Sequence, residues 1–142
     1  MGCIKINGPN ILHIFEGIMD AEKYIDILNS NILYLFFNED KLIYQGDNDP
    51  KHTELVKIWK NDYQIKSIDW PSNSPDLNPI ENVWHILKSE IEQTQTNSTE
   101  EFIKCIEDKW KHIPIEIINK IIGSMKRRCE KIIESNGEHI DY

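Results

Sequence analysis

A proline-rich stretch that runs directly into a helical pattern constrains this chain most. Residues 70–82 read WPSNSPDLNPIEN, and VWHILKSEI follows with apolar side chains at helical spacing. Proline fixes φ, and the first helical position accepts it because its missing N–H would have no partner there. The pattern therefore predicts a helix over residues 79–92 that starts at Pro79 from a stiff loop.

The first turn of this predicted helix carries Glu81, three residues after the predicted N-cap Asn78. That spacing is typical of a capping box, in which the glutamate side chain accepts from the backbone N–H of the cap residue. A capping box does not explain the earlier prolines, Pro71 and Pro75. A rigid loop is useful when a carboxylate must be held at a set distance from another group, which is the alternative interpretation.

The rest of the chain alternates between short β-rich runs and amphipathic helices before it becomes entirely helical. A strand, a helix and a further strand predict a parallel crossover, so the fold class is α/β. We expect a hairpin over 2–15 turning at Asn7-Gly8, a helix from Asp20 to about Phe37, a strand over 41–45, a helix capped by Thr53 and a strand near 65–70. After the helix over 79–92 we expect one helix opened by Ser98 and a last helix from about Pro114. The last helix is expected to bury Ile118, Ile121, Ile122, Met125, Cys129 and Ile132.

Composition excludes several classes of protein. The 142 residues suit one core, and 24 acidic against 16 basic side chains give a net charge of −8, which argues against attraction of nucleic acid over the whole surface. No apolar run is long enough to span a bilayer, so we expect no membrane partner and an intracellular protein. The three cysteines lack disulfide or zinc-ligand spacing, which predicts free buried thiols.

Asp47 is the natural partner for Glu81. It follows the predicted strand 41–45, within the sequence GDNDP. An Asx turn explains this composition by itself. However, sites in α/β sheets gather at the carboxyl ends of strands, where two carboxylates can share one divalent ion.

The two motifs together, QGDNDPKHT and WPSNSPDLNPIENVW, resemble the signature of the mariner superfamily of cut-and-paste DNA transposases. The similarity extends over essentially the whole chain. It implies a ribonuclease H-like catalytic domain with an Asp, Asp, Glu metal triad. Asp47 would be its second aspartate and Glu81 its glutamate, both binding Mg²⁺ or Mn²⁺, with Asn48, His52 and Asn82 as supporting polar side chains.

The resemblance also implies a fold, a domain organisation and a function for this chain. The fold would be a truncated ribonuclease H-like fold followed by C-terminal helices. It would form a single partial domain over 1–142, with the sheet and the active-site part at 1–92 and the helices at 98–135. The family's first aspartate lies on a strand before the hairpin, and no residue here matches it; the DNA-binding helix-turn-helix modules have no match either. The expected function is therefore a fragment of a transposase catalytic domain, which is catalytically incomplete as written.

Partners and location follow from the resemblance alone: transposon ends and target DNA, a homodimer or pairing with full-length transposase, and a nuclear location. The alternative is a non-catalytic, domesticated binding or assembly module. Two smaller predictions come from the helical pattern. Trp84 is expected in the core, and the basic run of Lys126, Arg127 and Arg128 is expected on a solvated helix face rather than at a DNA contact.

Overall fold

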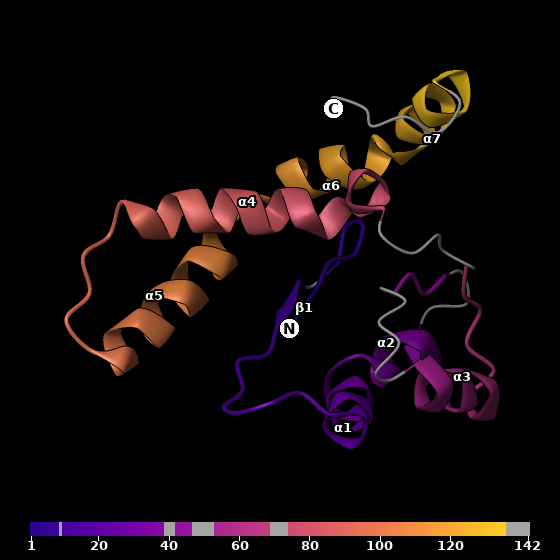
Figure 1. The fold of residues 1–142 in the computed structure, drawn as a ribbon, viewed down its shortest axis with the longest axis horizontal. Coiled ribbons are helices and arrows are strands. Elements are labelled where there is room, and N and C mark those ends of the chain that lie inside the picture. The colour runs from indigo at the N-terminus through magenta and orange to yellow at the C-terminus, as the bar shows by residue number, and fades with distance from the viewer. Residues whose placement is uncertain (9, 39–41, 47–52, 69–73, 136–142) are drawn as a thin grey trace. The chain divides into compact units, whose positions relative to one another are not determined.

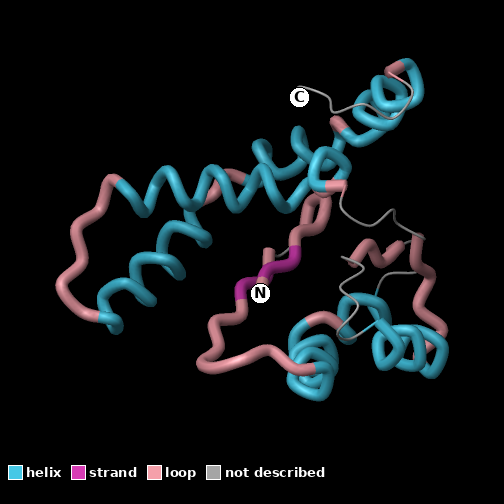
Figure 2. Tube along the Cα trace, viewed as in Figure 1, coloured by secondary structure: helices cyan, strands magenta, loops and turns pink. Residues whose placement is uncertain are grey.

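The computed structural model describes residues 1–8, 10–38, 42–46, 53–68 and 74–135, drawn as ribbon and tube in Figures 1 and 2. The chain forms two compact units. One combines Met1–Ile14 with Ser74–Tyr142, and we call it the hairpin-helix unit. The other, Phe15–Asn73, we call the aromatic unit.

The hairpin-helix unit starts with the predicted hairpin. Strands β1 (Gly2–Cys3) and β2 (Ile11–Leu12) pair antiparallel. The ladder continues outward, because the N-terminal amine donates to His13 O at 2.7 Å and His13 N donates to Met1 O at 2.8 Å. Asn7 has a φ of 53°, a left-handed conformation that asparagine tolerates better than most residues. The Asn-Gly signal therefore marked the turn correctly.

Helices α4 (Pro79–Glu92), α5 (Thr99–His112) and α6 (Ile115–Gly123) form the main core of this unit. The bounds of α4 and the start of α5 after Ser98 are as predicted. Trp84 is half-buried and packs on the core, as expected for the apolar face of an amphipathic helix. The buried members of this core are Val83, Leu87, Trp110, Ile113 and Ile118.

The hairpin packs on these helices through contacts that join the two ends of the chain. Asn7 and Asn119 of α6 bind each other: Asn7 N donates to Asn119 Oδ1 at 2.9 Å, and Asn119 Nδ2 donates to Asn7 Oδ1 at 2.7 Å. The Trp110 indole N–H donates to Asn10 O at 3.3 Å. Gly2 lies against the rings of Trp84 and Trp110, where there is no room for a larger residue.

The prediction of one continuous helix from Pro114 is wrong, because the helix is broken. Instead of one helix from Pro114, the chain forms α6 and then α7 (Met125–Glu134), separated by Ser124. A Gly-Ser pair is a common cause of such a break. Here the Ser124 hydroxyl donates to Ile121 O at 2.6 Å, a side-chain bond that competes with the helical ladder. Ile118 is buried as predicted, whereas the other expected core residues of this segment, Ile121, Ile122, Met125, Cys129 and Ile132, are half-buried.

The aromatic unit contains α1 (Ala21–Asn31), α2 (Leu33–Asn38) and α3 (Thr53–Asp62). Asp20 caps α1 as predicted, accepting from Lys23 N at 2.8 Å. The single helix expected up to Phe37 is instead broken at Ile32. The side chain of Asn31 donates to Ile27 O at 3.0 Å, and such bonds to the preceding turn bend helices.

Around α3 the predicted parallel crossover is present at one bridge. Tyr44 pairs with Ser67 in parallel orientation: Tyr44 N donates to Lys66 O at 2.8 Å, and Ile68 N donates to Tyr44 O at 3.1 Å. Trp59 of α3 is buried and its indole N–H donates to Asn29 Oδ1 at 2.7 Å. Helices with an antiparallel hairpin and a parallel bridge are consistent with the α/β class, while the ribonuclease H-like strand order stays a prediction.

Candidate functional site

Part of the predicted site lies outside the described residues. Asp47, Asn48 and His52 belong to the segment 47–52, and nothing in the structure tests their predicted roles. The site is therefore built from the other motif, where Glu81 and Asn82 stand in the first turn of α4.

The loop before α4 is stiffened as its prolines suggest. Pro75 starts a short 3-10 helix, η1 (Pro75–Leu77), and Pro79 occupies the first position of α4. Leu77 and Pro79 are both buried, so apolar packing fixes the loop on either side of Asn78. The start of α4 is thus held by backbone restriction and by burial together.

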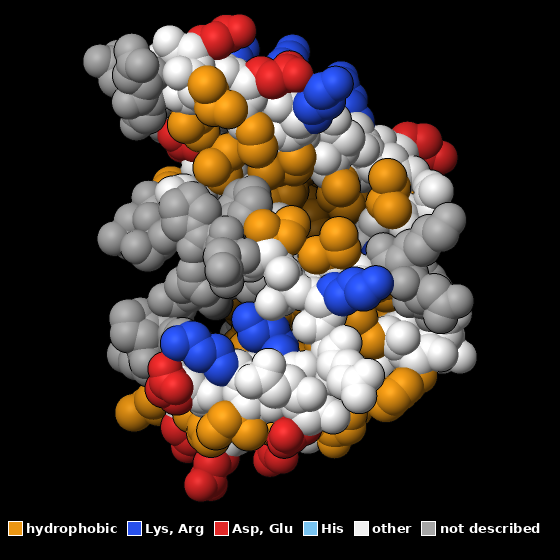
Figure 3. Space-filling view, turned by 90° about the vertical axis from the view of Figure 1, so that its right-hand side faces the viewer, with side chains coloured by type: hydrophobic (Ala, Val, Ile, Leu, Met, Phe, Trp, Pro, Cys, Tyr) orange, Lys and Arg blue, Asp and Glu red, His pale blue; other side chains and the backbone are white. Residues whose placement is uncertain are grey.

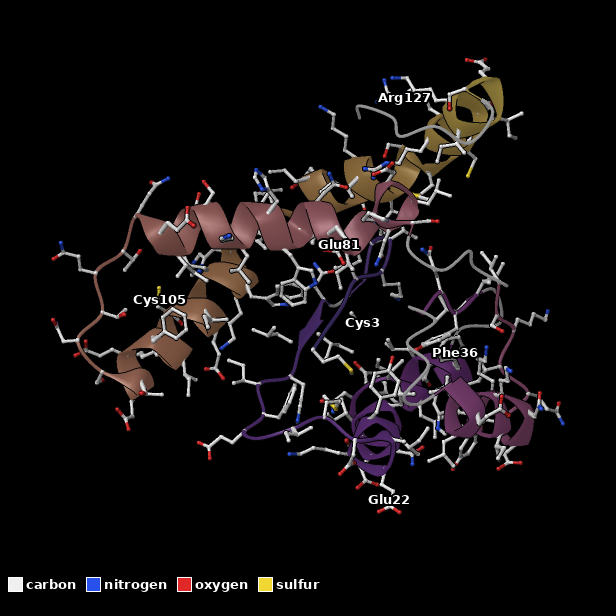
Figure 4. All side chains as sticks on the ribbon, viewed as in Figure 1. Cys3, Glu22, Phe36, Glu81, Cys105 and Arg127 are labelled. Carbon is white, nitrogen blue, oxygen red and sulfur yellow. The ribbon has the colours of Figure 1, made fainter. Side chains whose placement is uncertain are left out.

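Glu81 does not form the predicted capping box. The backbone N–H of Asn78, which the glutamate would have bound, already donates to Pro75 O at 2.9 Å as the end of η1. The Asn78 side chain makes no cap bond to the helix; its Nδ2 donates to Glu81 Oε1 at 3.4 Å, a long hydrogen bond. Glu81 is consequently an exposed carboxylate that the helix start does not use (Figure 4).

The start of α5 shows the other outcome for the same spacing. There Ser98 Oγ accepts from Glu101 N at 3.1 Å, and Glu101 Oε2 accepts from Asn97 N at 2.8 Å. Glu101 therefore satisfies a backbone donor near its own cap, and Glu81 does not. The difference between the two glutamates lies in the segment 74–77, because Leu77, the α4 counterpart of Asn97, donates its N–H to Ser74 O at 3.1 Å and the cap residue Asn78 donates its own to Pro75 O.

Arg128 corrects the prediction of a solvated basic face. Lys126 and Arg127 are exposed as expected, but Arg128 is only 3% exposed, the one buried charged residue among those the structure describes. Its guanidinium donates from Nη2 to Asn82 Oδ1 at 2.8 Å, from Nη1 to Asp76 O at 3.0 Å and from Nε to Ser124 Oγ at 2.8 Å. A burial signal was available in the sequence, because Arg128 lies between Met125 and Ile132 on the apolar stripe of α7.

The described residues supply one candidate metal ligand rather than a complete site. No three His, Cys, Asp or Glu side chains lie together as a metal-binding group within the described ranges. Glu81 fits a hard divalent cation as a single ligand, since Mg²⁺ prefers carboxylate oxygens.

The distribution of surface charge and the length of the helices give two further observations. Acidic and basic side chains are scattered over the face drawn in Figure 3, where many apolar side chains gather together, and that view shows no broad basic area. None of the helices in the described part of the chain combines the length and the apolar character needed to cross a lipid bilayer.

Comparison with known proteins agrees with the resemblance seen in the motifs. Residues 1–104 match the family model of the DDE superfamily endonucleases. The chain is 35% identical to the Tc1 transposable-element transposase of Caenorhabditis elegans over 99% of its own length and 53% of that protein. It is 33% identical to the Tcb2 transposase of Caenorhabditis briggsae over the same shares, and 39% identical to the Tc3 transposase of Caenorhabditis elegans over 97% of this chain and 40% of that protein.

The chain thus spans about half the length of the curated relatives it matches. The matched region includes both GDNDP and the proline-rich stretch with Glu81. The chain is similar to several transposases along nearly its whole length, and on the match over residues 1–104 it belongs to the DDE superfamily of endonucleases.

Proposed function

We propose that this chain is part of the catalytic domain of a cut-and-paste DNA transposase, in which Asp47 and Glu81 are two carboxylate ligands of a divalent metal ion. The observation that carries the proposal is the exposed Glu81 carboxylate, which the start of α4 leaves unused although its spacing suits a cap. Membership of the DDE endonucleases supports the same role for it.

In this proposal the protein residues bind and orient. Glu81 is held on the first turn of α4 by a loop with two proline positions and buried Leu77. Mg²⁺ or Mn²⁺, when bound, supplies Lewis-acid activation of the nucleophile and stabilises the leaving oxygen in phosphodiester cleavage. Asn82 contributes indirectly, because its side-chain oxygen is bound to Arg128. Asn48 and His52 keep their proposed supporting roles.

The activity proposed for the 142 residues by themselves is weaker than that of an intact transposase. Two carboxylates hold Mg²⁺ loosely, since this ion keeps most of its waters when so few ligands are offered. The family resemblance assigns no residue here to the first aspartate. We therefore propose metal binding without efficient cleavage for this polypeptide. DNA as partner, self-association or pairing with full-length transposase, and a nuclear location are proposed on family membership.

The test is binding of Mn²⁺ to the 142-residue polypeptide, followed by the paramagnetic resonance signal of the free ion. Glu81→Gln and Asp47→Asn should each weaken Mn²⁺ binding at least about 10-fold, the scale on which metal-site substitutions act. Glu101→Gln is the matched control: it stands at the same helical position of α5, and glutamine also serves in a capping box. Its Mn²⁺ affinity should equal that of the unmodified chain.

Cleavage is measured in parallel on supercoiled DNA that carries Tc1-like transposon ends. The unmodified polypeptide should nick no faster than Asp47→Ala, Glu81→Ala in Mg²⁺ or Mn²⁺. Nicking that disappears in the double variant would show that the proposed incompleteness is wrong. Mn²⁺ binding that is unaffected by both single substitutions would overturn the assignment of the ligands and favour a non-catalytic assembly module.

A further inference from the structure

The buried guanidinium of Arg128 needs a reason to be where it is. Transfer of a charge out of water is costly unless hydrogen-bonding partners surround it. Arg128 is 3% exposed, whereas its adjacent residue Arg127 is exposed, so an arginine at this part of α7 can lie at the surface. Its three donors instead reach three separate segments, all in the hairpin-helix unit.

Two of those segments lie before and after Glu81 in the sequence. Nη1 binds the backbone oxygen of Asp76 in η1, on the loop side of the helix start. Nη2 binds the side chain of Asn82, the residue directly after Glu81. The guanidinium is planar and its donors have a fixed geometry, so the two bonds together restrict the orientation of the α4 first turn relative to η1.

The third bond anchors the arginine itself. Nε donates to Ser124 Oγ at 2.8 Å, at the break between α6 and α7. Ser124 is in turn held by its hydroxyl bond to Ile121 O. The side chain is therefore fixed near its base by the C-terminal helices and at its tip by the two segments that flank Glu81.

We propose that Arg128 is a positioning residue for Glu81: it sets the direction of the α4 first turn so that the Glu81 carboxylate faces the metal ion. This inference rests on the proposed function of Glu81. Arg128 binds a backbone oxygen and an amide, so it acts through the first turn and is not a ligand. Metal sites require their ligands within about 0.5 Å of the working geometry, and loss of a supporting hydrogen bond typically weakens metal affinity about 10- to 100-fold.

The experiment uses the 142-residue polypeptide with Arg128→Lys, and Arg127→Lys as the matched control on the adjacent exposed residue. Lysine keeps the charge but lacks the planar guanidinium whose separate N–H groups can bind two acceptors at once. Hydrogen exchange by NMR is followed at the amides of Asn82 and Val83, with those of α5 as internal reference. We expect exchange at least about 10-fold faster at Asn82 and Val83 in Arg128→Lys, with α5 unchanged, and no change in Arg127→Lys.

Mn²⁺ affinity is the second measurement, because a merely structural role would not change it. Arg128→Lys should weaken Glu81-dependent Mn²⁺ binding about 10-fold. Ser124→Ala removes the Nε acceptor together with the hydroxyl bond to Ile121 O, and leaves the guanidinium itself intact. It should act in the same direction by about 3-fold and serves if Arg128→Lys does not fold.

The outcomes separate this inference from the proposed function. If Glu81→Gln does not weaken Mn²⁺ binding, the ligand role of Glu81 fails, and the exchange rates alone decide whether Arg128 restrains the first turn. If Mn²⁺ binding depends on Glu81 but neither its affinity nor the exchange at Asn82 and Val83 changes in Arg128→Lys and Ser124→Ala, the positioning role is wrong and the ligand assignment stands.

Discussion

Gly2→Ala is expected to destabilise the hairpin-helix unit although alanine is the smallest possible change. A Cβ at residue 2 would lie 2.7 Å from Cη2 and Cζ2 of Trp84 and 3.0 Å from Cη2 of Trp110. Carbon atoms pack comfortably at about 3.5–4.0 Å, so the new methyl group is roughly 0.8 Å too close to the first ring. Either the β1 strand or the two indoles must move.

The size of the effect follows from what resists that movement. Trp110 is 4% exposed, its indole N–H is bound to Asn10 O, and its ring packs on Trp84 with centroids 5.1 Å apart. The hairpin is held as well, because the N-terminal amine and His13 exchange two hydrogen bonds. Overpacking of such a site costs about 1–3 kcal/mol, which is the expected decrease in the free energy of unfolding.

Gly123→Ala is the matched control with the opposite sign. Gly123 is the last residue of α6, and a Cβ there would meet nothing within 4 Å. Alanine restricts the unfolded chain and favours the helix, so the free energy of unfolding should rise by about 0.4–1 kcal/mol. Urea titration followed by the Trp110 indole N–H resonance reports on this unit directly. A Gly2→Ala variant as stable as the unmodified chain would refute the reasoning from packing.

Two other predictions concern a helix cap and a thiol. Ser98→Ala should lower the free energy of unfolding by about 1 kcal/mol, since Ser98 Oγ accepts from Glu101 N, whereas Asn78→Ala should cost less because Asn78 makes no side-chain cap bond; urea titration of both variants checks the contrast. Burial, partly offset by Lys5, raises the pKa of the Cys3 thiol from its ordinary value of 9.0 to about 11. Its alkylation by iodoacetamide, followed by mass spectrometry, should therefore accelerate only as the pH approaches 11. The stability gained by keeping this thiol neutral is present below pH 9 and is lost as the pH rises through 11. An alkylation midpoint near pH 9 would show that the thiol is not buried in solution.

Local sequence patterns were sufficient to predict an element whose ends are set by its own residues. The helix over residues 79–92 follows from Pro79 and an unbroken apolar face, and the turn at Asn7 follows from the conformational tolerance of an Asn-Gly pair. Both helix breaks were missed for a shared reason. Asn31 and Ser124 are acceptable helical residues until their side chains bond to the preceding turn, and that competition depends on small energy differences that periodicity does not contain.

Arg128 was missed because its burial depends on partners far away in the sequence. The charge rule that places arginine at the surface is usually correct, since an unpaired buried cation is very costly. Here the partners exist: Asp76 O and Asn82 Oδ1 lie on segments roughly fifty residues earlier in the chain. The apolar stripe of α7 marked the position as inward-facing, but only the tertiary structure supplies the acceptors that make an inward-facing arginine stable.

The two glutamates at capping-box spacing explain why the proline stretch matters for the candidate site. A carboxylate engaged with its own helix start is less available to a metal ion, because the same lone pairs serve both partners. At α5 the Glu101 carboxylate is engaged in this way. At α4 the loop forms η1 first, and the N–H groups of Leu77 and Asn78 donate to Ser74 O and Pro75 O. Glu81 is left with one long contact at 3.4 Å. The prolines therefore do more than stiffen the approach to the helix: by setting η1 directly before α4, they keep the proposed metal ligand out of the cap it would otherwise complete.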